Sequence, residues 1–164
     1  MKKRTISVVV DNCAGVLARV SNLFSRRGFN IDSLAVGTTE KEEFSRITIV
    51  VKCDDELLEQ IVSQLRKLEC VYRVAVLNDD AMVTRELTLI KVNASAENRS
   101  SILEIADVFR AKVIDLSPDT ITMEVTGTGA KTDAIMTMLS DFGVVEVART
   151  GLVALDRGRS NIYG

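Results

Sequence analysis

The sequence predicts an α+β fold made of two tandem βαββαβ domains. Three observations support this prediction: short apolar strands alternate with amphipathic helices, the same order of elements occurs twice, and a polar break at Asn78-Asp79-Asp80 separates the two copies. The chain has 164 residues, of which 46% are hydrophobic and 27% are charged. That length is enough for two small domains, each with its own core.

The first half contains four strand signals and two helix signals. Residues 5–10 alternate in polarity, which is typical of a strand with one buried face. Gly28 follows a stretch of helical spacing, where a helix end favours a residue with positive φ. The expected elements are strand 5–10, a helix on Val16, Leu17, Val20, Leu23 and Phe24, strands 30–37 and 44–52 around a charged hairpin tip, helix 55–68 and strand 71–77.

The second half repeats this order, with a hairpin around the only proline, Pro118. Its expected elements are strand 86–92, helix 98–110, strands 112–116 and 120–126, helix 131–140 and strand 144–147. We therefore predict domains at residues 1–78 and 84–164, each a ferredoxin-like antiparallel sheet with two helices on one face. The polar tail from Arg157 is expected to fray.

Some of the predicted strands are apolar on both faces. In strand 44–52, Ile47, Ile49 and Val51 lie on one face, whereas Thr48 and Val50 lie on the other. Strands of this kind are usually covered on both sides, and sheet edges also need a cover. We therefore expect self-association, most simply as a two-fold homodimer.

The charge balance and the absence of histidine exclude several classes of function. Lys and Arg total 21 against 23 Asp and Glu, a balance that argues against a polyanion such as nucleic acid as the main partner. Without histidine there is no Ser-His-Asp triad, Cys-His pair or His-ligated zinc. No set of side chains suggests a catalytic site or a metal site, and the Gly127–Thr132 segment lacks the glycine that a phosphate loop needs before its lysine.

The cysteines and the apolar runs indicate where the protein resides. Cys13, Cys53 and Cys70 form no C-x-x-C pair and are expected to be reduced thiols. The basic start is followed by an apolar run too short for a secretory signal, and no run has the length of a membrane span. We expect a soluble, cytoplasmic protein with no membrane partner.

The segment Asp11–Leu17, between the first strand and the first helix, is the candidate ligand site. Gly15 allows close approach of a ligand, and the N–H groups that follow it at a helix N-terminus suit a carboxylate. Asn12 adds an amide that both donates and accepts, and Asn30 is expected near the same end of the sheet. The alternative is a simple capping loop, with Asn12 in an Asx turn and Asn30 as a turn residue.

These residues also carry a resemblance to a known family. The pattern Asn12-x-x-Gly15-Val16-Leu17-x-Arg19-Val20-x-x-Leu23-Phe24-x-x-Arg27-Gly28-Phe29-Asn30-Ile31-x-Ser33-Leu34 resembles the opening of the small regulatory subunit of acetolactate (acetohydroxyacid) synthase, whose N-terminal module is an amino-acid-sensing ACT domain. In the second half, Phe109–Pro118 and Ala148–Gly158 resemble the C-terminal domain of the same family. The resemblance covers nearly the whole chain.

The resemblance implies a non-catalytic partner of a large subunit that holds thiamine diphosphate, magnesium and FAD and joins two 2-ketoacids. It further implies activation of that subunit and feedback inhibition by valine in branched-chain amino-acid biosynthesis, with valine bound where two ACT domains meet. Asn12, Gly15 and Asn30 match the effector-contacting positions, and Ala14, Val16, Leu17 and Ile31 would line the same pocket. The alternatives are a free-standing ACT-domain sensor with another output and, less in keeping with the composition, an enzyme in its own right.

Overall fold

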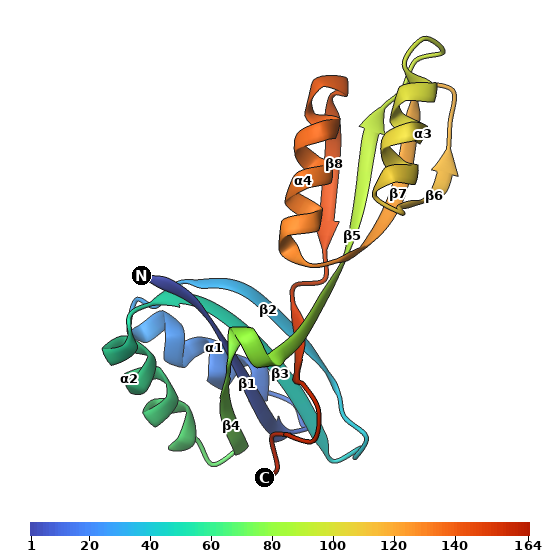
Figure 1. The fold of residues 1–164 in the computed structure, drawn as a ribbon. Helices are drawn as coiled ribbons and strands as arrows, with labels where there is room; N and C mark the ends of the chain where they lie inside the picture. Colours follow the sequence, from blue (N-terminus) through green and yellow to red (C-terminus); the bar gives the residue numbers. More distant parts are fainter. The chain divides into compact units, whose positions relative to one another are not determined.

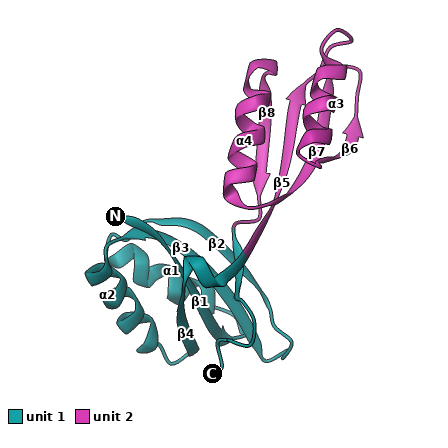
Figure 2. Ribbon diagram, viewed as in Figure 1, with its two compact units in different colours: residues 1–83, 152–164 teal, residues 84–151 magenta.

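The chain folds into two compact units, each with its own sheet and helices (Figure 2). The computed structural model describes all 164 residues. Residues 1–83 and 152–164 form the first unit, and residues 84–151 form the second. The sequence predicts a second domain that extends to residue 164, whereas in the structure residues 152–164 pack with the first unit.

The first unit is a four-stranded antiparallel sheet with two helices on one face, which confirms the predicted fold class (Figure 1). The strand order is β2-β3-β1-β4. Its elements are β1 (Lys2–Asp11), α1 (Val16–Arg26), β2 (Ile31–Thr38), β3 (Phe44–Cys53), α2 (Asp55–Arg66) and β4 (Val71–Leu77), and a short 3₁₀ turn (Asp79–Ala81) follows.

Apolar spacing explains why both helices lie on the same side of this sheet. Val16, Val20 and Phe24 form the buried stripe of α1 and pack with alternate residues of β1 and β3. Asp54 caps α2, because its carboxylate accepts a hydrogen bond from the Leu57 N–H at 3.0 Å. These contacts produce a continuous core between the helices and the sheet.

The second unit repeats the plan, with strand order β6-β7-β5-β8. Thr128 caps its second helix, so the Gly127–Thr132 segment is an ordinary strand-to-helix turn. A separate core lies between its helices and its sheet. The elements are β5 (Met82–Asn93), α3 (Arg99–Val108), β6 (Lys112–Leu116), β7 (Thr120–Gly127), α4 (Gly129–Leu139), a 3₁₀ turn (Ser140–Phe142) and β8 (Val144–Arg149).

The C-terminal segment 152–164 lies on the helix-free face of the first sheet (Figure 1). It contains β9 (Val153–Asp156). The Leu152 N–H donates to Ser33 Oγ at 2.9 Å, and Arg46 Nη2 donates to the Ala154 carbonyl at 3.1 Å. Ser33 and Arg46 both belong to the helix-free face, so the segment is attached to two strands of this sheet.

This arrangement corrects one expectation from the sequence and removes one argument for another, the homodimer, which itself stays a prediction. The tail does not fray, because Ile162 is only 7% exposed and the Arg157 N–H donates to the Ala81 carbonyl at 2.8 Å. The apolar second face of the sheet does not by itself require another chain. On that face Ser7 and Val9 are fully buried within one chain, and its own C-terminal segment supplies part of the cover.

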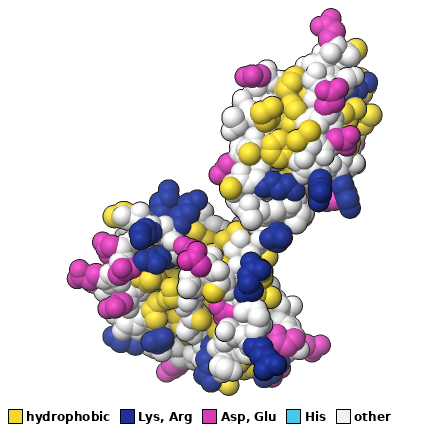
Figure 3. Space-filling view, in the orientation of Figure 1, with side chains coloured by type: hydrophobic (Ala, Val, Ile, Leu, Met, Phe, Trp, Pro, Cys, Tyr) yellow, Lys and Arg dark blue, Asp and Glu magenta, His cyan; other side chains and the backbone are white.

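The surface agrees with the balanced composition. In Figure 3, acidic and basic side chains alternate over the first unit, whereas on the second unit most basic side chains gather at one end beside a hydrophobic patch. No helix is both long enough and apolar enough to cross a membrane.

Candidate functional site

The loop between β1 and α1 is tied to the rest of the first unit by backbone hydrogen bonds. The Asp11 N–H donates to the Cys70 carbonyl at 2.9 Å, and the Asn12 N–H donates to the Glu43 carbonyl at 2.8 Å. The first bond reaches the start of β4 and the second reaches the β2–β3 hairpin. The loop therefore has a fixed position at one end of the sheet.

The side chain of Asn12 is fixed by two further hydrogen bonds. Its Nδ2 donates to the Glu42 carbonyl at 2.9 Å, and its Oδ1 accepts from Ser45 Oγ at 3.1 Å. These bonds differ from those of an Asx turn, since both partners lie more than 29 residues along the chain. Asn12 remains exposed, so its remaining acceptor and donor capacity faces solvent with a defined orientation.

Helix α1 begins without a cap, which leaves donors for a ligand. Gly15 is the N-cap residue with φ +86°, a conformation that favours glycine, and it has no side chain to accept from the first turn. The first turn also lacks an acidic residue. Free N–H groups and the positive end of the helix dipole together suit a carboxylate.

The apolar residues of the loop divide into two groups. Val16 is 5% exposed and belongs to the core, so it positions the loop from below. Leu17 is 44% exposed, and Ala14 is also exposed, so both present apolar surface next to the free N–H groups. The loop thus places the free N–H groups of α1 and the Asn12 amide beside a small apolar surface.

Asn30 and Ile31 lie at the end of the sheet opposite the β1–α1 loop. The prediction that Asn30 lies at the same end as this loop is therefore wrong within one chain. Ile31 lies in register, through β3, with Arg4 near the start of β1, whereas Asn12 follows Asp11 at the end of that strand. The two ends are separated by about 24 Å, at about 3.4 Å per residue. The reason is that α1 runs antiparallel to β1 and returns the chain to the end where β1 began.

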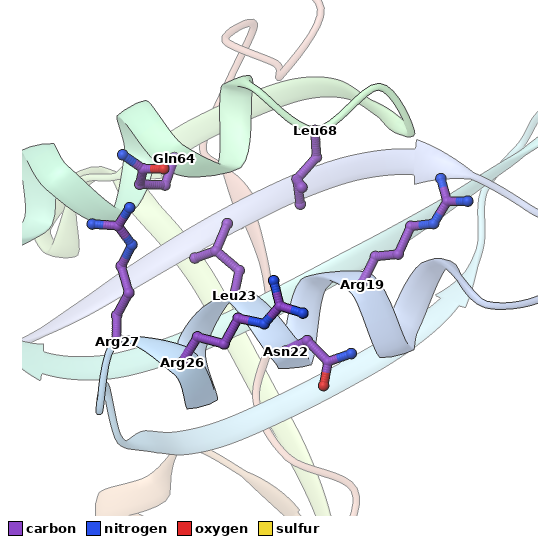
Figure 4. A pocket seen from close by; sticks show the side chains of 7 residues that line it. All are labelled: Arg19, Asn22, Leu23, Arg26, Arg27, Gln64 and Leu68. Atoms are coloured by element: carbon purple, nitrogen blue, oxygen red, sulfur yellow. The ribbon is translucent and has the colours of Figure 1, made fainter.

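Neither of two clefts on the first unit is lined by the predicted site residues. One, of about 330 Å³, lies between α1 and α2 and is lined by Arg19, Arg26 and Arg27 (Figure 4). The other, of about 370 Å³, lies between α2 and β4. The first cleft was not predicted, although the sequence contains a signal for it. Arg19 and Arg26 are seven residues apart and therefore lie on the same side of a helix.

The cysteines and acidic residues form no further polar cluster. Cys13 is exposed in the candidate loop, whereas Cys53 and Cys70 are buried and unpaired. Burial raises the pKa of the Cys53 thiol, which keeps it protonated. No group of three or more Cys, Asp or Glu side chains is arranged to hold a metal ion.

Both halves of the chain match models of one protein family. Residues 6–73 match the ACT domain of acetohydroxyacid synthase small subunits, and residues 85–158 match the model described as the small subunit of acetolactate synthase. The acetolactate synthase small subunit of Mycobacterium bovis is 51% identical over 161 residues, which cover 98% of this chain and 96% of that protein. The chain belongs to the acetolactate synthase small-subunit family.

Other members of the acetolactate synthase small-subunit family agree over the full length. The probable small subunit of Archaeoglobus fulgidus is 49% identical, over 95% of this chain and 98% of that protein. The crystal structure of the Thermotoga maritima small subunit matches with a TM-score of 0.91 and 40% identity, over 98% of this chain and all of that one. The family confirms the ferredoxin-like fold of both units, with an ACT domain first.

Proposed function

We propose that this chain is the regulatory, non-catalytic subunit of a cytoplasmic acetolactate synthase, and that it confers feedback inhibition by valine. The catalytic subunit would hold thiamine diphosphate, magnesium and FAD, and this chain would raise its activity. The observation that carries the proposal is the uncapped start of α1 at Gly15 in a member of this family. Its free N–H groups suit the carboxylate of an amino acid.

The amino acid would be held by groups of different kinds. Its carboxylate would accept hydrogen bonds from the first turn of α1, while the oriented Asn12 amide and nearby carbonyl oxygens would accept from its ammonium group. The apolar side chain would lie against Ala14 and Leu17, both of which are exposed. A branched aliphatic side chain such as that of valine fits this small apolar surface.

A site that includes Asn30 needs a second copy of the chain. Within one chain Asn30 lies at the far end of the sheet from the loop. Strand β2 is an edge strand, so two copies related by a two-fold axis can pair their β2 strands antiparallel. That pairing brings the partner subunit's Asn30 to the end of the sheet that holds Asn12 and Gly15. Pairing through β4, the other edge, would leave the partner subunit's Asn30 several strands away.

Feedback inhibition requires valine to bind the inhibiting state of the complex better than the active state. A coupling free energy of about 1–3 kcal/mol, usual for allostery, shifts the balance about 5- to 150-fold. A ligand that bridges two ACT domains would fix their relative orientation. We propose that this orientation changes how the dimer holds the catalytic subunit.

Isothermal titration calorimetry with valine, leucine and isoleucine tests the binding site. We expect saturable valine binding that Asn30→Ala removes, with two ligands per dimer as the two-fold arrangement requires. Asn22→Ala is the matched control, because Asn22 is also exposed and lies outside the proposed site. Binding that survives Asn30→Ala would contradict the composite site, and failure of all three amino acids to bind would contradict the sensor role of the free chain.

A further inference from the structure

The cleft between α1 and α2 combines an apolar floor with a cationic rim. Leu23 of α1 and Leu68, just after α2, lie in the middle of the cleft (Figure 4). The side chains of Arg19, Arg26 and Arg27 surround them, and all three are exposed to solvent. The cleft has a volume of about 330 Å³ and is open, so an extended segment of chain can enter it from the side.

These three arginines have no acidic partner within the chain. The ion pairs of the structure all use other residues, and no Asp or Glu lines the cleft. Acidic residues outnumber basic ones in the whole sequence, 23 to 21, so a lining with three positive charges and no negative one does not follow from composition. Like charges around one cleft repel each other unless a group of opposite charge binds between them.

The chemistry of the lining defines what would bind. A guanidinium group presents a planar fork of donors that matches a carboxylate, and a floor of two leucines accepts an apolar side chain. Small-molecule sites bury most of their ligand, whereas this cleft is open, with all three arginines at the surface. The occupant is therefore better explained as a peptide segment than as a free small anion.

We propose that this cleft docks an acidic segment of the catalytic subunit, with carboxylates on Arg19, Arg26 and Arg27 and an apolar side chain between Leu23 and Leu68. This inference rests on the proposed function, which supplies the partner. It also gives α1 a second role. The helix starts at the effector loop, and Arg19 lies about one turn beyond Gly15, so one rigid element contacts both valine and the partner.

A pair of charge reversals tests the docking site. Arg26 and Arg66 both lie in the last turn of a helix, so Arg26→Glu and Arg66→Glu lose the same favourable interaction with the helix dipole. Arg66 lines the other cleft, beside Glu59. Binding of the full-length chain to its catalytic subunit is measured by biolayer interferometry over a range of salt concentrations. Circular dichroism checks that both variants are folded.

We expect Arg26→Glu to weaken binding about tenfold or more and to reduce its salt dependence, while Arg66→Glu changes the affinity less than about twofold. Equal affinities of the two variants would overturn the docking site. Saturable binding of inorganic phosphate that Arg26→Glu removes, with unchanged affinity for the catalytic subunit, would overturn it in favour of a small-anion site. If the wild-type chain does not bind the catalytic subunit, the proposed function itself fails, before any variant is compared.

Discussion

At the scale of single residues, Gly15 combines a structural and a functional requirement. Its φ of +86° favours glycine, and the space around its Cα is open, so a side chain there would project into solvent where the effector is proposed to bind. The same position leaves the start of α1 uncapped. A substitution here therefore tests the ligand site without disturbing the core.

Gly15→Asp should abolish valine inhibition and spare activation of the catalytic subunit, because a carboxylate at this position occupies the free donors and repels the carboxylate of valine. The matched control is Gly158→Asp, since Gly158 also has a positive φ, open surroundings and an exposed position. Steady-state activity of the complex with and without valine measures both effects. Loss of inhibition and activation together in Gly15→Asp alone would contradict a local role.

At the scale of elements, the C-terminal segment covers the helix-free face of the first sheet through its own buried side chains. Ile162→Ala should lower the stability of the first unit by about 2–4 kcal/mol, because Ile162 is 7% exposed. Leu155→Ala is the control and should stay within about 0.5 kcal/mol, because Leu155 in the same segment is 55% exposed. Amide hydrogen exchange in β1 reports on this unit alone, and equal protection in the two variants would contradict the packing.

Titration of Tyr163 should loosen the same segment. Burial and the neighbouring Glu40 carboxylate raise the pKa of Tyr163 above its ordinary value. Because the pKa in the folded protein is raised, its contribution to attachment is complete below pH about 10 and is lost as the pH rises through the folded value. The protection of residues 152–164, taken as their exchange rate relative to the intrinsic amide exchange rate at each pH, should fall over that range in the wild type and stay level in Tyr163→Phe. The same loss of protection in Tyr163→Phe would show that another group is responsible.

The elements could largely be predicted from the sequence, because their signals are local. Strands 71–77 and 112–116 have the predicted bounds, and the helix predicted from Lys131 begins at Gly129 because Thr128 caps it. Strand β9 was missed, since four residues in a terminal segment give too little periodicity. The position of that segment depends on contacts with β2 and β3, which no local pattern records.

The candidate site could be predicted only in part. The loop of Asn12 and Gly15 was identified correctly as an exposed helix start, because glycine placement and capping are local properties. The position of Asn30 was predicted wrongly. The predicted order of elements already implies it, because a helix that runs antiparallel to β1 ends at the far end of the sheet. The hydrogen bond between Asn12 and the β2–β3 hairpin joins residues more than 29 positions apart, so no local sequence pattern predicts it.

At the scale of the whole molecule, the proposed valine site requires a two-fold dimer through β2. Val36→Lys should produce a monomer that no longer binds valine, because a lysine on an edge strand opposes strand pairing. Val36 is 48% exposed on β2, and Val76 is 42% exposed on β4, the other edge. Val76→Lys is therefore the matched control and should remain dimeric. Analytical ultracentrifugation separates the two outcomes, and a dimeric Val36→Lys variant would refute the β2 interface.

The most direct test of the regulatory role is the rate of acetolactate formation by the purified catalytic subunit, measured alone, with this chain, and with this chain and saturating valine. We expect the chain to raise the rate, and we expect valine to lower it again in the complex while leaving the catalytic subunit alone unaffected. An unchanged rate on addition of the chain would contradict its role as an activator, and a complex indifferent to valine would contradict its role as the sensor.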